Sequence, residues 1–163
     1  EIRLSLVGSE MCIRDRKMAI DLWGFKDVKD LEKNTSDFPE TILKEQISAL
    51  GDKTGFVLYG KPLYMKVNTY EIEYKAATIF NVVVPVLDDY SKTIMIMYSN
   101  FECNFPVAIT VGKDFTDDME CFEPSYECNN IDEFKEALKK ILCSDEVMSV
   151  IKTLYSKANM LGN

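Results

Sequence analysis

One short run of charged residues has the composition of a metal-dependent nuclease site. Glu71, Glu73 and Lys75 alternate with uncharged residues, and the two-residue period of a β-strand would place all three on one face. In such sites the carboxylates hold Mg²⁺ and the amine positions the attacking water. The chemistry also needs an upstream carboxylate, for which Asp52 is the only plausible donor, and an ordinary solvated strand face has the same residues. A metal-dependent hydrolase is therefore an alternative and not the first interpretation.

An acidic, irregular segment lies between residues 113 and 130. Its candidate binding residues are Asp114, Asp117, Asp118, Glu120 and Glu123. They lack the order of acids and glycine that defines a calcium-binding loop, so we expect no metal there. A solvated loop is the ordinary interpretation of such a segment. The functional interpretation is an acidic surface for a protein partner with a basic surface, since opposite charges accelerate association.

The residue types that are missing exclude several kinds of chemistry. The chain has no histidine, and its only arginines are Arg3, Arg14 and Arg16. Without histidine there is no Ser-His or Cys-His nucleophile pair and no histidine metal ligand. Without arginine in the body there is no bidentate clamp for phosphate. From residue 17 onward 24 carboxylates outnumber 16 lysines, which disfavours nucleic acid as a partner, and we expect no cofactor.

Cysteines and aromatic residues have ordinary structural interpretations. Behind Cys12 the cysteines are irregularly spaced and form no CxxC pair, at Cys103, Cys121, Cys128 and Cys143. Zinc sites usually show paired short spacings, so we expect reduced core thiols in preference to zinc or disulfides. Six aromatic residues can line a pocket or anchor an interface but suit core and rim positions better: Trp23, Phe25, Tyr59, Tyr64, Tyr70 and Tyr74.

The spacing of apolar residues predicts where helices and strands lie. A helix-like segment from residue 18 to 31 is interrupted by Gly24, and Asp37 with Glu40 has the capping-box spacing of a helix that ends near Leu50. Strands are expected over residues 56–59, 63–67, 70–75, 78–87, 93–98 and 107–111, with a hairpin at Gly60-Lys61-Pro62 and a turn at residues 88–92. Two closing helices begin after Asn130 and Ser144, which are suitable N-caps.

This order of elements predicts an α+β fold. Strands grouped between helices, with short links, indicate a largely antiparallel sheet of about five or six strands covered by N-terminal and C-terminal helices. We expect the closing helices to pack Phe134, Leu138, Ile141, Val150, Ile151 and Leu154 against Val82, Val84 and their neighbours.

Three sets of residues resemble small uncharacterised bacterial proteins of unknown function. They are Leu43-Lys44-Glu45-Gln46 with Lys53-Thr54, Phe105-Pro106-Val107, and Glu133-Phe134 with Ala137-Leu138-Lys139. The resemblance covers residues 38 to 157. It implies a shared structure and no activity, so no functional residue follows from it.

The first sixteen residues resemble the translation of a transposase-type sequencing adaptor. The codons CTC GTG GGC TCG GAG ATG TGT ATA AGA GAC encode Leu6 to Asp15 in order. The resemblance implies that residues 1–16 are not native and are to be left out of fold reasoning. Residues 17–163 then form a single α+β domain, whose native sequence begins at Met18 or has lost residues upstream.

These observations predict a non-enzymatic, acidic, cytoplasmic binding protein of the immunity, antitoxin-like or inhibitor type. No apolar run approaches the roughly 20 residues of a membrane span, so we expect no membrane partner. Two alternatives remain open. One is the hydrolase with Glu71, Glu73 and Lys75, and the other is a small-ligand pocket between the sheet and the terminal helices.

Overall fold

A computed structural model describes residues 22–68, 72–116 and 122–162 and divides the chain into two units, which meet between Lys33 and Asn34. The segment predicted to be non-native, residues 1–16, lies outside the described residues. In the first unit, α1 (Val28–Glu32) begins where the Asp27 side chain accepts the Asp30 N–H. The helix predicted from residue 18 to 31 is thus much shorter among the described residues, and Gly24 lies outside it.

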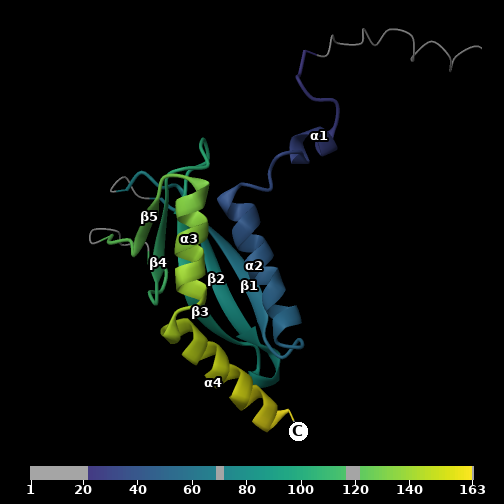
Figure 1. Ribbon diagram of the computed structural model, residues 1–163, viewed down its shortest axis with the longest axis vertical. Helices are drawn as coiled ribbons and strands as arrows, with labels where there is room; N and C mark the ends of the chain where they lie inside the picture. The colour runs from purple at the N-terminus through teal and green to yellow at the C-terminus, as the bar shows by residue number, and fades with distance from the viewer. Residues whose placement is uncertain (1–21, 69–71, 117–121, 163) are drawn as a thin grey trace, which may run out of the picture. The chain divides into compact units, whose positions relative to one another are not determined.

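The second unit is a five-stranded antiparallel sheet with three helices on one face (Figure 1). The strands are β1 (Tyr59–Lys66), β2 (Ala76–Val84), β3 (Tyr90–Ser99), β4 (Val107–Val111) and β5 (Tyr126–Cys128), in that spatial order. The helices are α2 (Pro39–Lys53), α3 (Ile131–Leu142) and α4 (Asp145–Leu161), and a short 3₁₀ turn, η1 (Pro85–Leu87), follows β2. The predicted α+β fold with an antiparallel sheet is confirmed.

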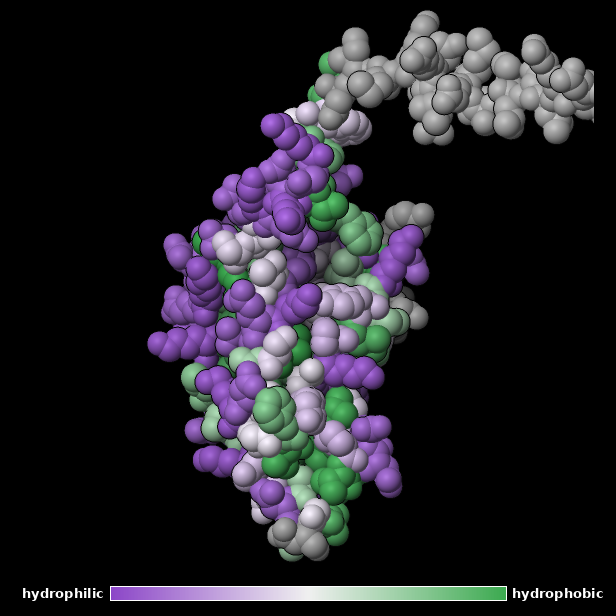
Figure 2. All heavy atoms as spheres, turned by 90° about the vertical axis from the view of Figure 1, so that its right-hand side faces the viewer, coloured by the Kyte–Doolittle hydropathy of each residue, from purple (hydrophilic) through white to green (hydrophobic). Residues whose placement is uncertain are grey.

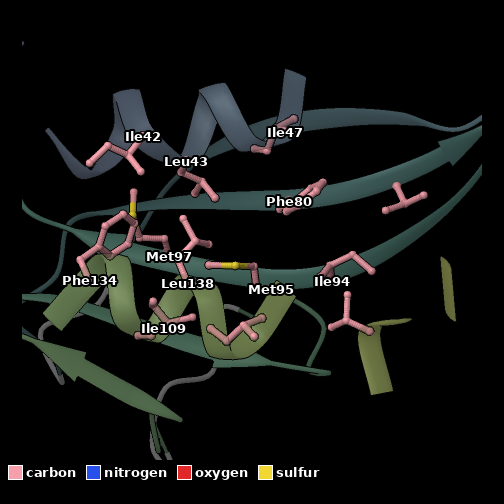
Figure 3. Close-up of a cluster of buried hydrophobic side chains, with 14 of the residues drawn as sticks. Ile42, Leu43, Ile47, Phe80, Ile94, Met95, Met97, Ile109, Phe134 and Leu138 are labelled. Carbon is pink, nitrogen blue, oxygen red and sulfur yellow. The ribbon is translucent and has the colours of Figure 1, made fainter. Parts of the chain in front are cut away.

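Both faces of the sheet's middle are apolar. On β3, Met95 and Met97 belong to a cluster that the helices cover, while Ile96 and Tyr98 belong to a second cluster on the opposite face. This alternation follows from the two-residue period of a strand. The helix-covered face is the larger core, and there the side chains of α2 and α3 converge on β2 and β3 (Figure 3).

The closing helices pack as the sequence predicts. Phe134 is fully buried and Leu138 is 4% exposed, and both lie in one cluster with Val82 and Val84. Ile141 and Leu154 are buried there too, with Val150 and Ile151 partly buried against the cluster. The apolar stripes of α3 and α4 therefore supply most of the cover over the sheet's centre.

Local capping explains where α3 and α4 begin. The Asn130 Oδ1 accepts the Glu133 N–H at 3.0 Å, and the Glu133 carboxylate accepts the Asn129 N–H at 2.8 Å. The Ser144 Oγ accepts the Val147 N–H at 3.3 Å. The cap predicted for α2 is wrong, because its N-cap is Phe38, which makes no side-chain hydrogen bond, and Pro39 fills the first turn.

The predicted hairpin at Gly60-Lys61-Pro62 is also wrong. These residues continue β1, which pairs with β2 along its whole length. Gly60 is needed for a different reason: a Cβ there would lie 2.2 Å from the carbonyl oxygen of Ile47, so only glycine lets α2 approach β1 this closely. Pro62 is tolerated because β1 is an edge strand and has an unpaired side.

Two further boundaries differ from the sequence prediction. Residues 72–75 form a bend and irregular backbone instead of a strand, and β2 starts only at Ala76. Within the segment predicted as one long loop, Tyr126–Cys128 pairs with β4 as β5. Three residues are too few to display a period, so β5 had no clear signal in the sequence.

Truncation of Leu138 tests the importance of the helix cover. We expect Leu138→Ala to lower the free energy of unfolding by about 2–5 kcal/mol, because it removes buried methyl groups and leaves a void. Met160, 76% exposed near the end of α4, provides the control. Met160→Ala should change the free energy of unfolding by less than about 0.5 kcal/mol. Chemical denaturation of both variants measures this, and equal values would contradict the packing described.

Candidate functional site

A cleft of about 620 Å³ opens on the helix-covered face between α2 and the α3–α4 pair. Its floor is the sheet, with Phe80 and Val82 from β2 and Ile94 from β3. The walls are mainly apolar and come from three helices: Ile42, Gln46, Leu50, Lys53 and the adjoining Thr54; Lys135, Leu138, Lys139, Leu142 and the adjoining Cys143; and Val147, Met148 and Ile151.

The spacing of the helices produces this cleft. α2 packs on β1 at one edge of the sheet, through the close approach at Gly60, while α3 contacts β5 at the other edge. Figure 1 shows α2 and α3 side by side over the sheet, with β2 and β3 between and behind them. β2 and β3 therefore lie beneath the space between α2 and α3, and this space is the cleft.

A β-bulge adds to the floor. The pairing of β2 with β3 shifts register between Phe80 and Asn81, so that Met95 pairs with Phe80 and Thr93 with Asn81, which leaves Ile94 unpaired. Ile94 and Met95 are consecutive, yet both lie in the helix-side cluster. The bulge therefore breaks the alternation and points one extra apolar side chain toward the helices.

The charged residues that line the cleft are all lysines. Lys135 and Lys139 are four residues apart on one face of α3, and Lys53 is the last residue of α2. Lys135 reaches Asp37 at 3.9 Å, with both side chains largely exposed. Within the part of the chain that the structure describes, Lys53 and Lys139 have no ion pair.

Of the other polar groups that line the cleft, one forms hydrogen bonds within the fold and two are exposed. The Thr54 Oγ1 donates to the Leu50 carbonyl at 2.9 Å and accepts the Leu58 N–H at 3.2 Å. Gln46 is exposed on α2, and Cys143 is an exposed free thiol. The arrangement offers an apolar floor, cationic side chains at its rim and one accessible thiol.

The acidic segment lies on the other face of the sheet. Asp114 and Glu123 are exposed, while Asp117, Asp118 and Glu120 fall outside the described residues. Sequence reasoning missed two anchors, Phe115 and Phe122, which pack on the second cluster. They are the aromatic residues that flank the acidic run, and this flanking position is the signal that could have revealed them.

Contacts at both ends hold this segment against the sheet. The ring of Phe122 meets Tyr98 edge to face with centroids 4.9 Å apart and lies 6.0 Å from Tyr74. The Lys113 Nζ donates to the Glu123 carbonyl at 3.3 Å. The described ends of the acidic segment are thus attached to the sheet, close to Asp114 and Glu123.

The three residues of the proposed nuclease motif are not brought together on a strand face in the part described. Glu71 lies outside the described residues, Glu73 is exposed on a bend, and the Lys75 Nζ donates to the Ile72 carbonyl at 3.2 Å. Asp52 precedes β1, whereas Lys75 accepts the Val67 N–H just beyond its end. The neighbouring Gly51 lies against Tyr59 at the start of β1, so Asp52 and Lys75 lie toward opposite ends of that strand. Residues 22–68, 72–116 and 122–162 contain no cluster of three or more potential metal ligands.

The cysteines and aromatic residues divide between core and surface. Cys128 is buried, and burial raises the pKa of its thiol, with Glu133 adding to the effect. Cys103 and Cys143 are exposed, so the prediction of core thiols is wrong for them, and Cys121 lies outside the described residues. Tyr74 is buried, whereas Trp23, Tyr59 and Tyr64 are exposed.

A further apolar surface is exposed near the end of α4. Figure 2 shows hydrophobic side chains gathered toward that end of the face it displays. The exposed apolar residues of this region are Phe56, Tyr59, Val86, Met160 and Leu161. This surface forms only a shallow hollow beside η1, without charged residues to select a ligand.

No protein-family model, curated protein or solved structure matches this sequence significantly. Among the described helices, none combines the length and apolar character needed to cross a membrane. Function must therefore be inferred from the chemistry of the cleft and of the acidic segment.

The buried tyrosines predict a loss of stability in alkali. Burial raises the pKa of Tyr98 above its ordinary value of 10.0, because a phenolate is poorly solvated there. Below about pH 10 both folded and unfolded chains keep the proton; above it the unfolded chain ionises first, so stability falls as pH rises. The melting temperature should fall less steeply above pH 10 in Tyr98→Phe, whereas Tyr155→Phe, at an exposed site, should behave as the wild type. Parallel slopes for all three proteins would contradict this.

Proposed function

We propose that this protein is a non-enzymatic binding protein that holds a small molecule with an apolar body in the cleft between α2 and the α3–α4 pair. The observation that carries the proposal is an open volume of about 620 Å³ with a largely apolar lining, in which Leu50, Leu142 and Ile151 are partly buried and Met148 is exposed. Small-molecule sites are typically concave, largely apolar and about 300–1,000 Å³ in volume. A ligand in this position would bury the apolar side chains that the three helices leave partly exposed around the cleft.

The residues of the cleft support binding better than catalysis. Catalysis by a cysteine nucleophile needs a base such as histidine, and the chain has no histidine. Cys143 is the sole thiol along the described walls, and its neighbours there are apolar residues and lysines. A binding role requires only the shape and the apolar surface of the cleft.

A substitution that fills the cleft tests this function. We expect a thermal-shift screen of apolar small molecules to yield a ligand that stabilises the wild type by about 2.7 kcal/mol at one hundred times its dissociation constant. Gln46→Trp places a large side chain at the mouth of the cleft and should remove the shift. Ser48→Trp, at an exposed site of α2 away from the cleft, should preserve it. A ligand that stabilises both variants equally does not bind in the cleft.

The acidic segment supports a second candidate function, cytoplasmic inhibition or immunity through a basic protein partner. The supporting observation is the attachment of its ends to the sheet by Phe115 and Phe122, since carboxylates on a fixed support lose less freedom on binding. Asp114 and Glu123 are the candidate binding residues of this segment that are described and exposed, and Glu127 is exposed in it as well. Asp117, Asp118 and Glu120 belong to the same candidate surface by sequence.

Charge reversal tests the second candidate. A partner isolated from bacterial lysate should associate more slowly with Asp114→Lys/Glu123→Lys, because the change reverses the attraction that steers encounter. Raised salt should slow the wild type in the same way, since salt screens exposed charges. Asp52→Lys/Glu45→Lys on α2 makes the same change of net charge elsewhere. Equal slowing by both double variants would rule out a specific acidic surface.

A further inference from the structure

The charged side chains that line the cleft have a single sign. Lys53, Lys135 and Lys139 are its charged lining residues among those described, although the chain as a whole has a net charge of −8. From this contrast we infer that the ligand is an amphipathic monoanion, an unbranched alkyl chain that ends in a carboxylate. This inference rests on the proposed function and adds the chemical class of the ligand.

Interactions within the fold stabilise the charges of these lysines only weakly. Lys135 and Lys139 are like charges at i and i+4, a spacing at which like charges destabilise a helix. Lys53 and Lys139 lie in last helical turns, where a cation is favourable, but Lys135 does not share that benefit. Its ion pair with Asp37, at 3.9 Å between exposed side chains, contributes little. Lys135 lies beside Asp37, just before α2, whereas Lys53 is the last of the 15 residues of that helix. One carboxylate cannot reach both ends of such a helix, so a carboxylate at either end of the cleft would be a counter-ion for the lysines at that end.

The apolar part of the cleft fits an alkyl chain. Phe80, Val82 and Ile94 offer no polar side-chain atom in the floor, and Leu138 and Ile151 continue the apolar surface up the walls. Lysine side chains run their methylene groups along apolar surface while the ammonium stays in water. The lysines can therefore extend the apolar contact and hold the charged head at the mouth.

The same residues favour a carboxylate over a phosphate. Phosphate sites typically use an arginine fork or the free N–H groups of a helix N-terminus, and residues 17–163 contain no arginine. The first turn of α4 borders the cleft through Val147 and Met148, but Ser144 already accepts the Val147 N–H. Asp145 and Glu146 in the same turn add negative charge, which repels a phosphate dianion more strongly than a carboxylate monoanion. A lysine ammonium recognises a head group as a point charge and without a fixed geometry. A monoanion such as a carboxylate needs no more than that.

The size of the cleft suits a small molecule. Its volume of about 620 Å³ lies within the roughly 300–1,000 Å³ that is typical of small-molecule sites. A single alkyl chain is narrow enough to lie along the partly buried Leu50, Leu142 and Ile151.

Paired ligands test the inference on the full-length protein. Decanoate and its neutral analogue decanamide, both below their aggregation limits, are titrated into the wild type by calorimetry. We expect decanoate to bind about tenfold more tightly, and this preference to shrink at high salt. Lys53→Gln/Lys135→Gln/Lys139→Gln should lose the preference while it still binds decanamide. Lys140→Gln is the control, because Lys140 pairs with Glu136 at 2.7 Å and does not line the cleft.

The outcomes separate this inference from the proposed function. Equal affinities of the wild type for decanoate and decanamide would overturn the anionic head group and leave an apolar ligand site intact. Absence of binding for both compounds would contradict the cleft as an alkyl-chain site, and hence this inference. The proposed function would fail separately, if no apolar compound distinguished Gln46→Trp from Ser48→Trp. A preference for decanoate that survives the triple lysine variant would place the anion elsewhere and also overturn the inference.

Discussion

The structure depends on the need to remove both faces of β2 and β3 from water. Phe80, Val82, Met95 and Met97 face the helices, while residues such as Ile96 face the opposite side. A strand pair that is apolar on both faces cannot be half-solvated, as an ordinary antiparallel sheet can. Helices supply one cover, and irregular segments supply the other.

The helix cover is incomplete for a geometric reason. Gly60 lets the backbone of α2 settle close to β1 at the edge of the sheet, and α3 lies toward β5 at the other edge. The interval between them forms the cleft, and Phe80, Val82 and the bulge residue Ile94 lie buried beneath it. The close approach that secures α2 to the sheet therefore also creates the cleft, so stability and binding have a common origin.

The opposite face shows how an irregular segment can serve as a cover. Phe115 and Phe122 reach the second cluster from the two described ends of the acidic segment, and Phe122 contacts Tyr98 and Tyr74. Asp114 and Glu123, next to these two aromatic residues in sequence, are exposed. A segment that is polar by composition thereby contributes to the core and still presents its charge to solvent.

The sequence by itself determined the features that depend on neighbouring residues. The stripes of α3 and α4, the caps at Asn130 and Ser144, and the strand-like run at residues 93–98 are local signals, and they were enough to establish an α+β fold. Where a local signal was ambiguous, the prediction failed: Gly60 was interpreted as a turn residue, since nothing nearby in the sequence reveals the carbonyl of Ile47.

Only the tertiary structure decided the cleft and its chemistry. Sequence reasoning allowed a pocket between the sheet and the terminal helices, but Lys53 and Lys139 belong to helices on opposite sides of the strands in the chain. Neither has a neighbour in sequence that marks it as a cleft residue. Their common position follows from where α2 and α3 come to rest on the sheet, and that depends on packing between residues far apart in the chain, which no local pattern encodes.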